Sequence, residues 1–107
     1  MSDDVIARLA RTVAERRLAS GDVSHTRMLL DGGPERCARK FGEEAIEAVI
    51  AGIGVDRGVL VGEAADVIYH LLVLLEVRGV PWADVVAALE ARTRQSGIQE
   101  KASRTTG

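Results

Sequence analysis

The sequence has few aromatic residues, prolines and cysteines. Its 107 residues include three aromatic side chains (Phe41, Tyr69 and Trp82), two prolines and a single cysteine, Cys37. A core with so little aromatic volume has to be built mainly from Ala, Val, Leu and Ile, which suits packed helices better than a small β-sandwich. One cysteine excludes both an intrachain disulfide and a thiolate zinc cluster, and it is compatible with a reducing cytoplasm.

An excess of charge of one sign and a long apolar run are also missing. The formal net charge is −2 with both signs interspersed, so no strong positive field is available to hold a nucleic-acid backbone. The longest apolar stretch, 67–75, is interrupted by His70 and is shorter than the roughly 20 residues that cross a bilayer. The acidic first residues lack the basic and apolar segments of a signal peptide. We therefore expect a cytoplasmic protein that binds neither nucleic acid nor membranes.

Apolar residues recur at helical spacing in four segments, with a short helical turn between the first two. Pro34 suits the first turn of the second helix, Gly79 suits the C-terminal cap of the third, and Pro81 suits the start of the fourth. The pattern predicts a single all-α domain over residues 1–95. Residues 96–107 lack apolar periodicity, so we expect a loosely ordered C-terminal tail. The expected helices run from about 3 to 21, 34 to 52, 58 to 78 and 81 to 95.

Acidic residues cluster on the second and third of these helices. Residues three and four apart share a helix face, so Glu43 and Glu44 both flank Glu47, and Glu63 shares a face with Asp66. The short glycine-rich connection over 52–58 makes the two helices antiparallel neighbours. At roughly 1.5 Å rise per residue, Glu47 and Glu63 both lie about 7 Å from the turn, and Glu44 and Asp66 both lie about 12 Å from it. The spacing predicts two acidic pairs level with each other.

These carboxylates favour a divalent cation. Side chains of one charge that face together repel one another unless a cation neutralises them, and Mg²⁺ is usually held by a few carboxylates together with substrate phosphates and water. The alternative is a solvated helix face, the usual meaning of surface glutamates. Two features weigh against that alternative. Lys40 is the only cation spaced to pair with Glu44 across one helical turn, and Asp66 lies where its helix becomes apolar.

The spacing Glu43-Glu44-x-x-Glu47, fifteen residues, then Glu63-x-x-Asp66 resembles the metal-binding signature of the MazG-like all-α nucleotide pyrophosphohydrolases. The flanking segments, 40–45 and 63–75, closely resemble the phosphoribosyl-ATP pyrophosphatase family of histidine biosynthesis. The likeness extends from about Arg16 to Arg104 and includes Ser24-x-Thr26, Arg78-Gly79-Val80 and Glu100-Lys101-Ala102-Ser103-Arg104.

The resemblance implies a four- to five-helix bundle completed by homodimerisation. It also implies hydrolysis of phosphoribosyl-ATP to phosphoribosyl-AMP and pyrophosphate, the second step of histidine biosynthesis, by Mg²⁺-assisted attack of water. The catalytic residues would be Glu43, Glu44 and Glu47, with Glu43 either a ligand or the base that orients water. The metal ligands would be Glu44, Glu47, Glu63 and Asp66.

Five further residues are candidates for binding substrate. Lys40 either reaches a phosphate or pairs with a glutamate one turn away. Ser24 and Thr26 suit phosphate binding through hydroxyls and backbone N–H groups, although local capping bonds are the commoner role for such residues. Lys101 and Arg104 either fold over a triphosphate or belong to a solvated tail. A departure from the family is His25, where members often carry an aromatic residue, and this difference bears on contacts with the base or ribose.

Two other functions remain open at this point. One is a housekeeping pyrophosphohydrolase of the same superfamily that cleaves noncanonical or deoxynucleoside triphosphates. The other is a non-catalytic helical dimer that binds nucleotides or a protein partner. A ferritin-like di-iron bundle is disfavoured, because neither His25 nor His70 has a glutamate three residues before it.

Overall fold

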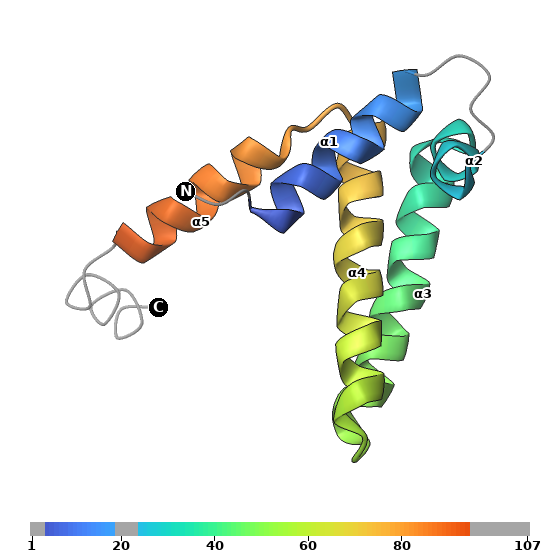
Figure 1. The fold of residues 1–107 in the computed structure, drawn as a ribbon, viewed down its shortest axis with the longest axis vertical. Coiled ribbons are helices and arrows are strands. Elements are labelled where there is room, and N and C mark those ends of the chain that lie inside the picture. The colour runs from blue at the N-terminus through green and yellow to red at the C-terminus, as the bar shows by residue number, and fades with distance from the viewer. Residues whose placement is uncertain (1–3, 19–23, 95–107) are drawn as a thin grey trace.

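A computed structural model describes residues 4–18 and 24–94, and within this part the chain forms five helices and no strands (Figure 1). The predicted all-α fold is therefore confirmed. The short turn expected between the first two long helices is a helix of two turns. The elements are α1 (Val5–Leu18), α2 (His25–Asp31), α3 (Gly33–Ile53), α4 (Arg57–Val77) and α5 (Trp82–Arg94).

Local sequence explains where the long helices begin and end. Pro34 lies in the first turn of α3, as predicted. The Oδ1 atom of Asp56 caps α4 by accepting from the backbone N–H groups of Gly58 (2.9 Å) and Val59 (3.3 Å). After α4, Gly79 adopts a φ of 70°, which favours glycine, and its N–H donates to the carbonyl of Glu76 at 2.9 Å. The predicted stop at Gly79 is confirmed.

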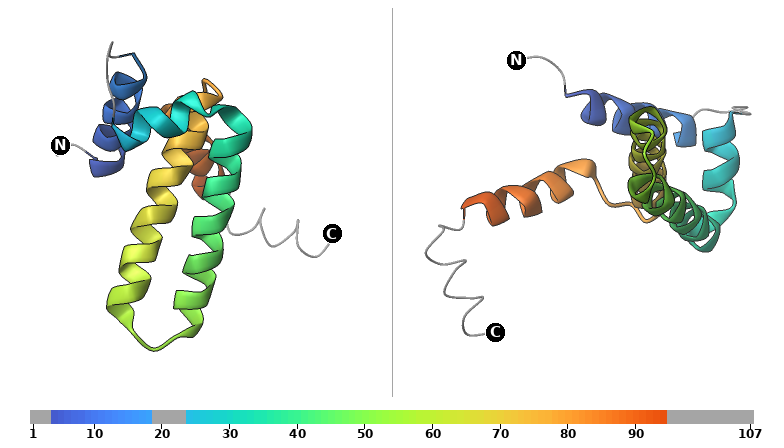
Figure 2. Two further views of the ribbon diagram at one scale, coloured as in Figure 1. Left: turned by 90° about the vertical axis from the view of Figure 1, so that its right-hand side faces the viewer. Right: turned by 90° about the horizontal axis from the view of Figure 1, so that it is seen from below.

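Helices α3 and α4 form a long antiparallel hairpin, as the glycine-rich connection predicts (Figures 1 and 2). Helix α1 crosses the end of the hairpin opposite the α3–α4 turn, and α2 lies beside it at the same end. Helix α5 leaves that end and points away from the hairpin. The hairpin is thus held by other helices at one end, while its turn projects outward.

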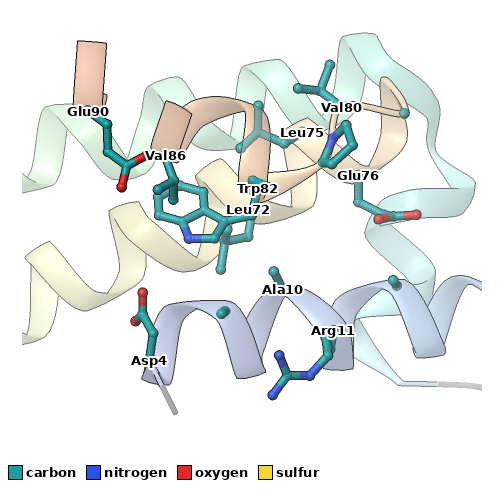
Figure 3. A pocket seen from close by; sticks show the side chains of 15 residues that line it. Asp4, Ala10, Arg11, Leu72, Leu75, Glu76, Val80, Trp82, Val86 and Glu90 are labelled. Atoms are coloured by element: carbon teal, nitrogen blue, oxygen red, sulfur yellow. The ribbon is translucent and has the colours of Figure 1, made fainter. Parts of the chain in front are cut away.

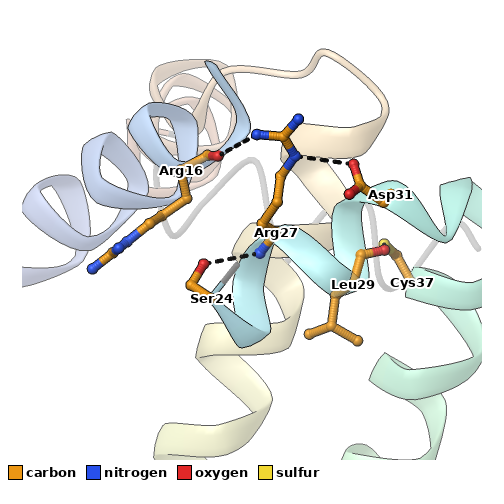
Figure 4. A network of polar contacts seen from close by, with 6 residues as sticks. All are labelled: Arg16, Ser24, Arg27, Leu29, Asp31 and Cys37. Carbon is orange, nitrogen blue, oxygen red and sulfur yellow. Dashed lines mark hydrogen bonds and ion pairs between the residues drawn. The ribbon is translucent and has the colours of Figure 1, made fainter. Parts of the chain in front are cut away.

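The core lies at the end of the hairpin that α1 and α2 cover. It contains Val13 of α1, Leu29 and Leu30 of α2, Cys37 of α3, and Leu72 and Val73 of α4. Cys37 is a small side chain at the centre of this core, only 1% exposed. Its thiol donates to the carbonyl of Leu29 at 3.1 Å, and burial raises the pKa of this thiol (Figure 4).

Polar contacts fix α1 and α2 against the other helices (Figure 4). The Arg27 guanidinium bonds Asp31 at 3.0 Å within α2 and donates to the carbonyl of Arg16 of α1 at 3.4 Å. Arg17 of α1 reaches α4, where it donates to both the carbonyl (2.8 Å) and the carboxylate (3.0 Å) of Glu76. These bonds join segments as far as 59 residues apart in the sequence.

The apolar pattern of the second predicted helix does not describe one buried face. Ile46, Val49 and Ile50 are 62 to 64% exposed, although they continue the period that begins at the buried Cys37. Leu89 of α5 is also 48% exposed. The reason is that α1 and α2 cover only one end of the hairpin. The outer half of α4 likewise exposes Val59, Leu60 and Val61.

Helix α4 is long and apolar enough to cross a membrane by length and composition alone. One such helix is weak evidence, because the central helix of a soluble protein passes the same test. Here the helix carries Glu63, Asp66 and His70, and its C-terminal half contributes Leu72 and Val73 to the core. Its composition is therefore explained within a helical bundle.

An apolar groove of about 750 Å³ lies between α1, α4 and α5 (Figure 3). The Trp82 indole lies in it, close to Leu72 and Val86, with the carboxylates of Asp4 and Glu90 at one end. The indole Nε1 is buried and has no acceptor within the described residues. Among the residues that the structure describes, none of the predicted site residues lines this groove.

Candidate active site

Three of the predicted carboxylates meet between α3 and α4. Glu44, Glu63 and Asp66 can each offer one oxygen such that these three atoms lie within 4.8 Å of one another. Glu44 is buried at 8% exposure, Glu63 is half-buried and Asp66 is exposed, so the group opens to solvent on the side of Asp66. The predicted pairing of Glu44 with Asp66 across the hairpin is thus observed, and Glu63 joins the same group.

Glu63 has the most unfavourable environment of the three. Its Oε1 atom is buried without a hydrogen-bond partner in the described part of the chain. Burial raises the pKa of this carboxyl, and repulsion from Glu47, Asp66 and Glu44 raises it further. A buried oxygen without a donor, surrounded by like charges, fits a bound cation. Because the donors are all carboxylate oxygens, the residues fit a hard ion such as Mg²⁺.

The other two predicted glutamates lie at the edge of this group. Glu47 is exposed and contributes no atom to the group of three, but its charge is close enough to raise the pKa of Glu63. Glu43 is 56% exposed and faces Lys40, whose Nζ lies 3.7 Å from its Oε1. The same Nζ lies 3.5 Å from Oε2 of Glu44. Of the two roles considered for Lys40, pairing with glutamates is therefore observed.

The side chains of Ser24 and Thr26 both serve the local structure of α2. Ser24 Oγ accepts from the N–H of Arg27 at 3.1 Å and caps the helix. The Thr26 hydroxyl lies 2.5 Å from the Tyr69 hydroxyl, where either oxygen can donate. This bond joins α2 to α4 one turn beyond Asp66. Lys101 and Arg104 lie outside the described residues.

His25 of α2 faces His70 of α4. His70 is buried, and its ring makes edge contacts with Tyr69 (centroids 4.9 Å apart) and His25 (6.5 Å). Burial lowers the pKa of His70, while the nearby Glu44 carboxylate opposes that shift. Its burial and ring contacts fit a structural role for this residue. His25 is exposed and lines a hollow beside α3.

That hollow, of about 620 Å³, adjoins the acidic group and includes side chains that the sequence did not indicate as site residues. Arg36 and Arg39 line it together with Lys40 and Glu43. Arg36 lies four residues before Lys40 and three before Arg39, so it shares a face of α3 with each of them, and this was the available signal. Arginines are common on helix surfaces, so the sequence alone does not identify these two as site residues.

Comparison with known proteins supports the resemblance based on these residues. Residues 6–93 match the family model described as phosphoribosyl-ATP pyrophosphohydrolase. The chain belongs to this family. The matched range includes all five carboxylates of the candidate site. It also includes all five helices, except for Val5 at the start of α1 and Arg94 at the end of α5.

Individual relatives carry the corresponding name. The chain is 57% identical over 96 residues to phosphoribosyl-ATP pyrophosphatase 1 of Rhodopseudomonas palustris, covering 90% of each protein. It is 57% identical over 100 residues to phosphoribosyl-ATP pyrophosphatase of Dinoroseobacter shibae, covering 94% of this chain and 98% of that one. The Agrobacterium fabrum phosphoribosyl-ATP pyrophosphatase is 53% identical over 106 residues, 99% of each chain.

Proposed function

We propose that this protein hydrolyses phosphoribosyl-ATP to phosphoribosyl-AMP and pyrophosphate, the second step of histidine biosynthesis in the cytoplasm. The observation that carries the proposal is the meeting of Glu44, Glu63 and Asp66 within 4.8 Å on neighbouring helices. The full-length likeness to proteins named for this reaction supports the choice of substrate.

Glu44, Glu63 and Asp66, with Glu47 beside them, are the residues that would hold Mg²⁺. A bound Mg²⁺ would neutralise these carboxylates and polarise the phosphoryl group that water attacks. The buried, unpartnered Oε1 atom of Glu63 supports this assignment, because a cation would supply the missing positive charge.

The remaining side chains orient the reactants. Water attacks the α-phosphorus in line, the bond from that phosphorus to the bridging oxygen breaks, and pyrophosphate leaves. Glu43 is exposed at the rim of the acidic group, where it can accept a proton from the attacking water or orient it. Lys40 lies between Glu43 and Glu44, within reach of a phosphate oxygen held near the carboxylates. Ser24, Thr26, Lys101 and Arg104 stay predictions as substrate contacts.

The active protein is a homodimer in this proposal. Ile46, Val49 and Ile50 of α3 and Val59, Leu60 and Val61 of α4 are exposed large apolar side chains on the outer half of one hairpin. So large an apolar surface on a small chain fits burial against a second copy. The second copy would complete the bundle, as the family resemblance implies.

The test is pyrophosphate release by the purified protein with Mg²⁺, from phosphoribosyl-ATP and from a panel of canonical, deoxy and noncanonical nucleoside triphosphates. We expect a clear preference for phosphoribosyl-ATP in kcat/KM, and loss of activity with EDTA. A preference for the panel would assign the protein to the housekeeping pyrophosphohydrolases instead.

A matched pair of variants tests whether the carboxylates are responsible. Glu44→Gln removes one charge from the group, and Glu15→Gln removes one from the exposed surface of α1. We expect Glu44→Gln to lower kcat/KM by about a hundredfold or more, a few kcal/mol of transition-state stabilisation, and Glu15→Gln to leave it unchanged. Unchanged activity in Glu44→Gln would contradict a catalytic role for the group.

A further inference from the structure

The hollow beside α3 has a charge opposite to that of the acidic group. It is lined by Arg36, Arg39 and Lys40, against two carboxylates, Glu35 and Glu43. One end of the hollow reaches Glu43, whose neighbour Glu44 belongs to the carboxylate group between α3 and α4. A ligand held at the carboxylates can therefore extend directly into a cationic space.

The cations follow one face of α3. Arg36, Lys40 and Glu44 are four residues apart, so they succeed one another along the helix turn by turn. Arg36 precedes Glu44 by two such steps, which is roughly 12 Å at 1.5 Å rise per residue. Arg36 and Glu44 are thus far enough apart along the helix for one ligand to place a different anionic group at each.

The three cations differ in the carboxylates that they already contact. Lys40 contacts both Glu43 and Glu44. Arg39 lies 3.7 Å from Glu35, but both side chains are largely exposed, and such pairs contribute little. Within residues 4–18 and 24–94, no hydrogen bond or ion pair engages Arg36. Arg36 is therefore the cation of the hollow most available to a ligand.

The Arg36 side chain packs closely against Gly32. The aliphatic part of Arg36 lies where a side chain at position 32 would be, and a methyl group built there would overlap with its Cδ. The backbone of Gly32 is ordinary helix, with φ −74° and ψ −11°, so its conformation does not require glycine. What glycine provides at this position is room for the aliphatic part of Arg36, and both residues line the hollow.

We infer that Arg36 and Arg39 form a subsite for the terminal 5′-phosphate of the phosphoribosyl group. This inference rests on the proposed function. Phosphoribosyl-ATP has two anionic ends, a triphosphate and a separate monophosphate on the second ribose, and the second end distinguishes it from ATP. The carboxylates with a metal ion suit the triphosphate. Without an intervening cation they would repel the monophosphate. Guanidinium groups bind phosphate with two parallel hydrogen bonds, so the arginines suit it.

The experiment compares two ligands that differ only in the phosphoribosyl group. The dissociation constants of phosphoribosyl-AMP and of AMP are measured by calorimetry with Mg²⁺, for the wild type, Arg36→Gln and the double variant Arg36→Gln/Arg39→Gln. Arg57→Gln, which changes an exposed arginine at the far end of the hairpin, is the control (Figure 1). Thermal unfolding establishes that each variant is folded.

We expect the wild type and Arg57→Gln to bind phosphoribosyl-AMP more tightly than AMP. Arg36→Gln should weaken the binding of phosphoribosyl-AMP about ten- to a hundredfold, which is the effect of losing a charge-assisted hydrogen bond, and should leave the binding of AMP unchanged. Its KM for phosphoribosyl-ATP should rise with little change in kcat. Gly32→Ala, which displaces Arg36 without removing its charge, should act in the same direction more weakly.

Failure of this inference and failure of the proposed function give different results. If the wild type releases no pyrophosphate from phosphoribosyl-ATP, the proposed function is wrong. If the wild type is active but does not discriminate between phosphoribosyl-AMP and AMP, the subsite is wrong. The subsite is also wrong if the double variant keeps the wild-type preference or weakens both ligands equally.

Discussion

The hydroxyl groups of Tyr69 and Thr26 lie 2.5 Å apart, although 43 residues separate them in the sequence. Tyr69 follows Asp66 by one turn of α4, and Thr26 lies in the first turn of α2. The bond therefore fixes α2, with its capping residue Ser24 and the exposed His25, relative to the helix that carries Glu63 and Asp66. The candidate substrate contacts of α2 are thus positioned by the helix that carries two of the proposed metal ligands.

Replacing Tyr69 with Phe tests this link. The aromatic ring and its packing remain, and only the hydroxyl is lost, so we expect a fall of about 1 kcal/mol in the free energy of unfolding. Thr26→Val removes the partner and should cost a similar amount. Denaturant unfolding of the two single variants and the double variant measures the coupling. If the two effects simply add, the bond contributes nothing to stability.

Glu63→Gln should raise the stability of the metal-free protein and lower its activity. A carboxyl whose pKa is raised by folding favours the folded state below its ordinary pKa of 4.5, and this contribution is lost as the pH rises through the raised value. In EDTA, Glu63→Gln should therefore melt at a higher temperature than the wild type at pH 7, by a margin that shrinks toward pH 4.

Added Mg²⁺ should raise the melting temperature of the wild type and have much less effect on Glu63→Gln, whose activity should fall by about a hundredfold or more. Glu15→Gln again serves as the control and should behave as the wild type in each measurement. If Glu63→Gln instead melts below the wild type in EDTA at pH 7, the ionised carboxylate of Glu63 does not destabilise the metal-free protein.

Ile50→Asp tests the proposed dimer. Ile50 is 64% exposed on α3, and an aspartate buried there between two copies would be an unpaired charge, which costs several kcal/mol. We expect light scattering to give a dimeric mass for the wild type and a monomeric mass for this variant at micromolar concentration. Leu18→Asp, at the 82% exposed end of α1, should stay dimeric. A monomeric wild type, or a dimeric Ile50→Asp variant, would argue against this interface.

Much of the fold could be predicted because its signals are local. Pro34 begins α3, Gly79 ends α4, and the glycines around Asp56 turn the chain between two helices, each through the backbone conformations that these residues permit. The acidic group could be predicted for the same reason. Helical spacing and one short connection suffice to bring Glu44 level with Asp66.

Burial was predicted less well, because it depends on which helices cover which face. The period through Ile46, Val49 and Ile50 is the one expected of a buried stripe, yet α1 and α2 cover only the other end of the hairpin. Periodicity shows which residues share a face, but it does not show what lies against that face.

The sequence by itself determined the four long helices, the helical turn between the first two, their order, the antiparallel hairpin and the likeness to a family named for phosphoribosyl-ATP. Only the tertiary structure decided that Glu63 joins Glu44 and Asp66 while Glu47 stays outside the group of three. It alone revealed the bond from Tyr69 to Thr26 and the cationic hollow at Arg36. The physical reason is that helix formation and turns depend on neighbours in sequence. Oxygen-to-oxygen distances, burial and cavities depend on how separate helices pack.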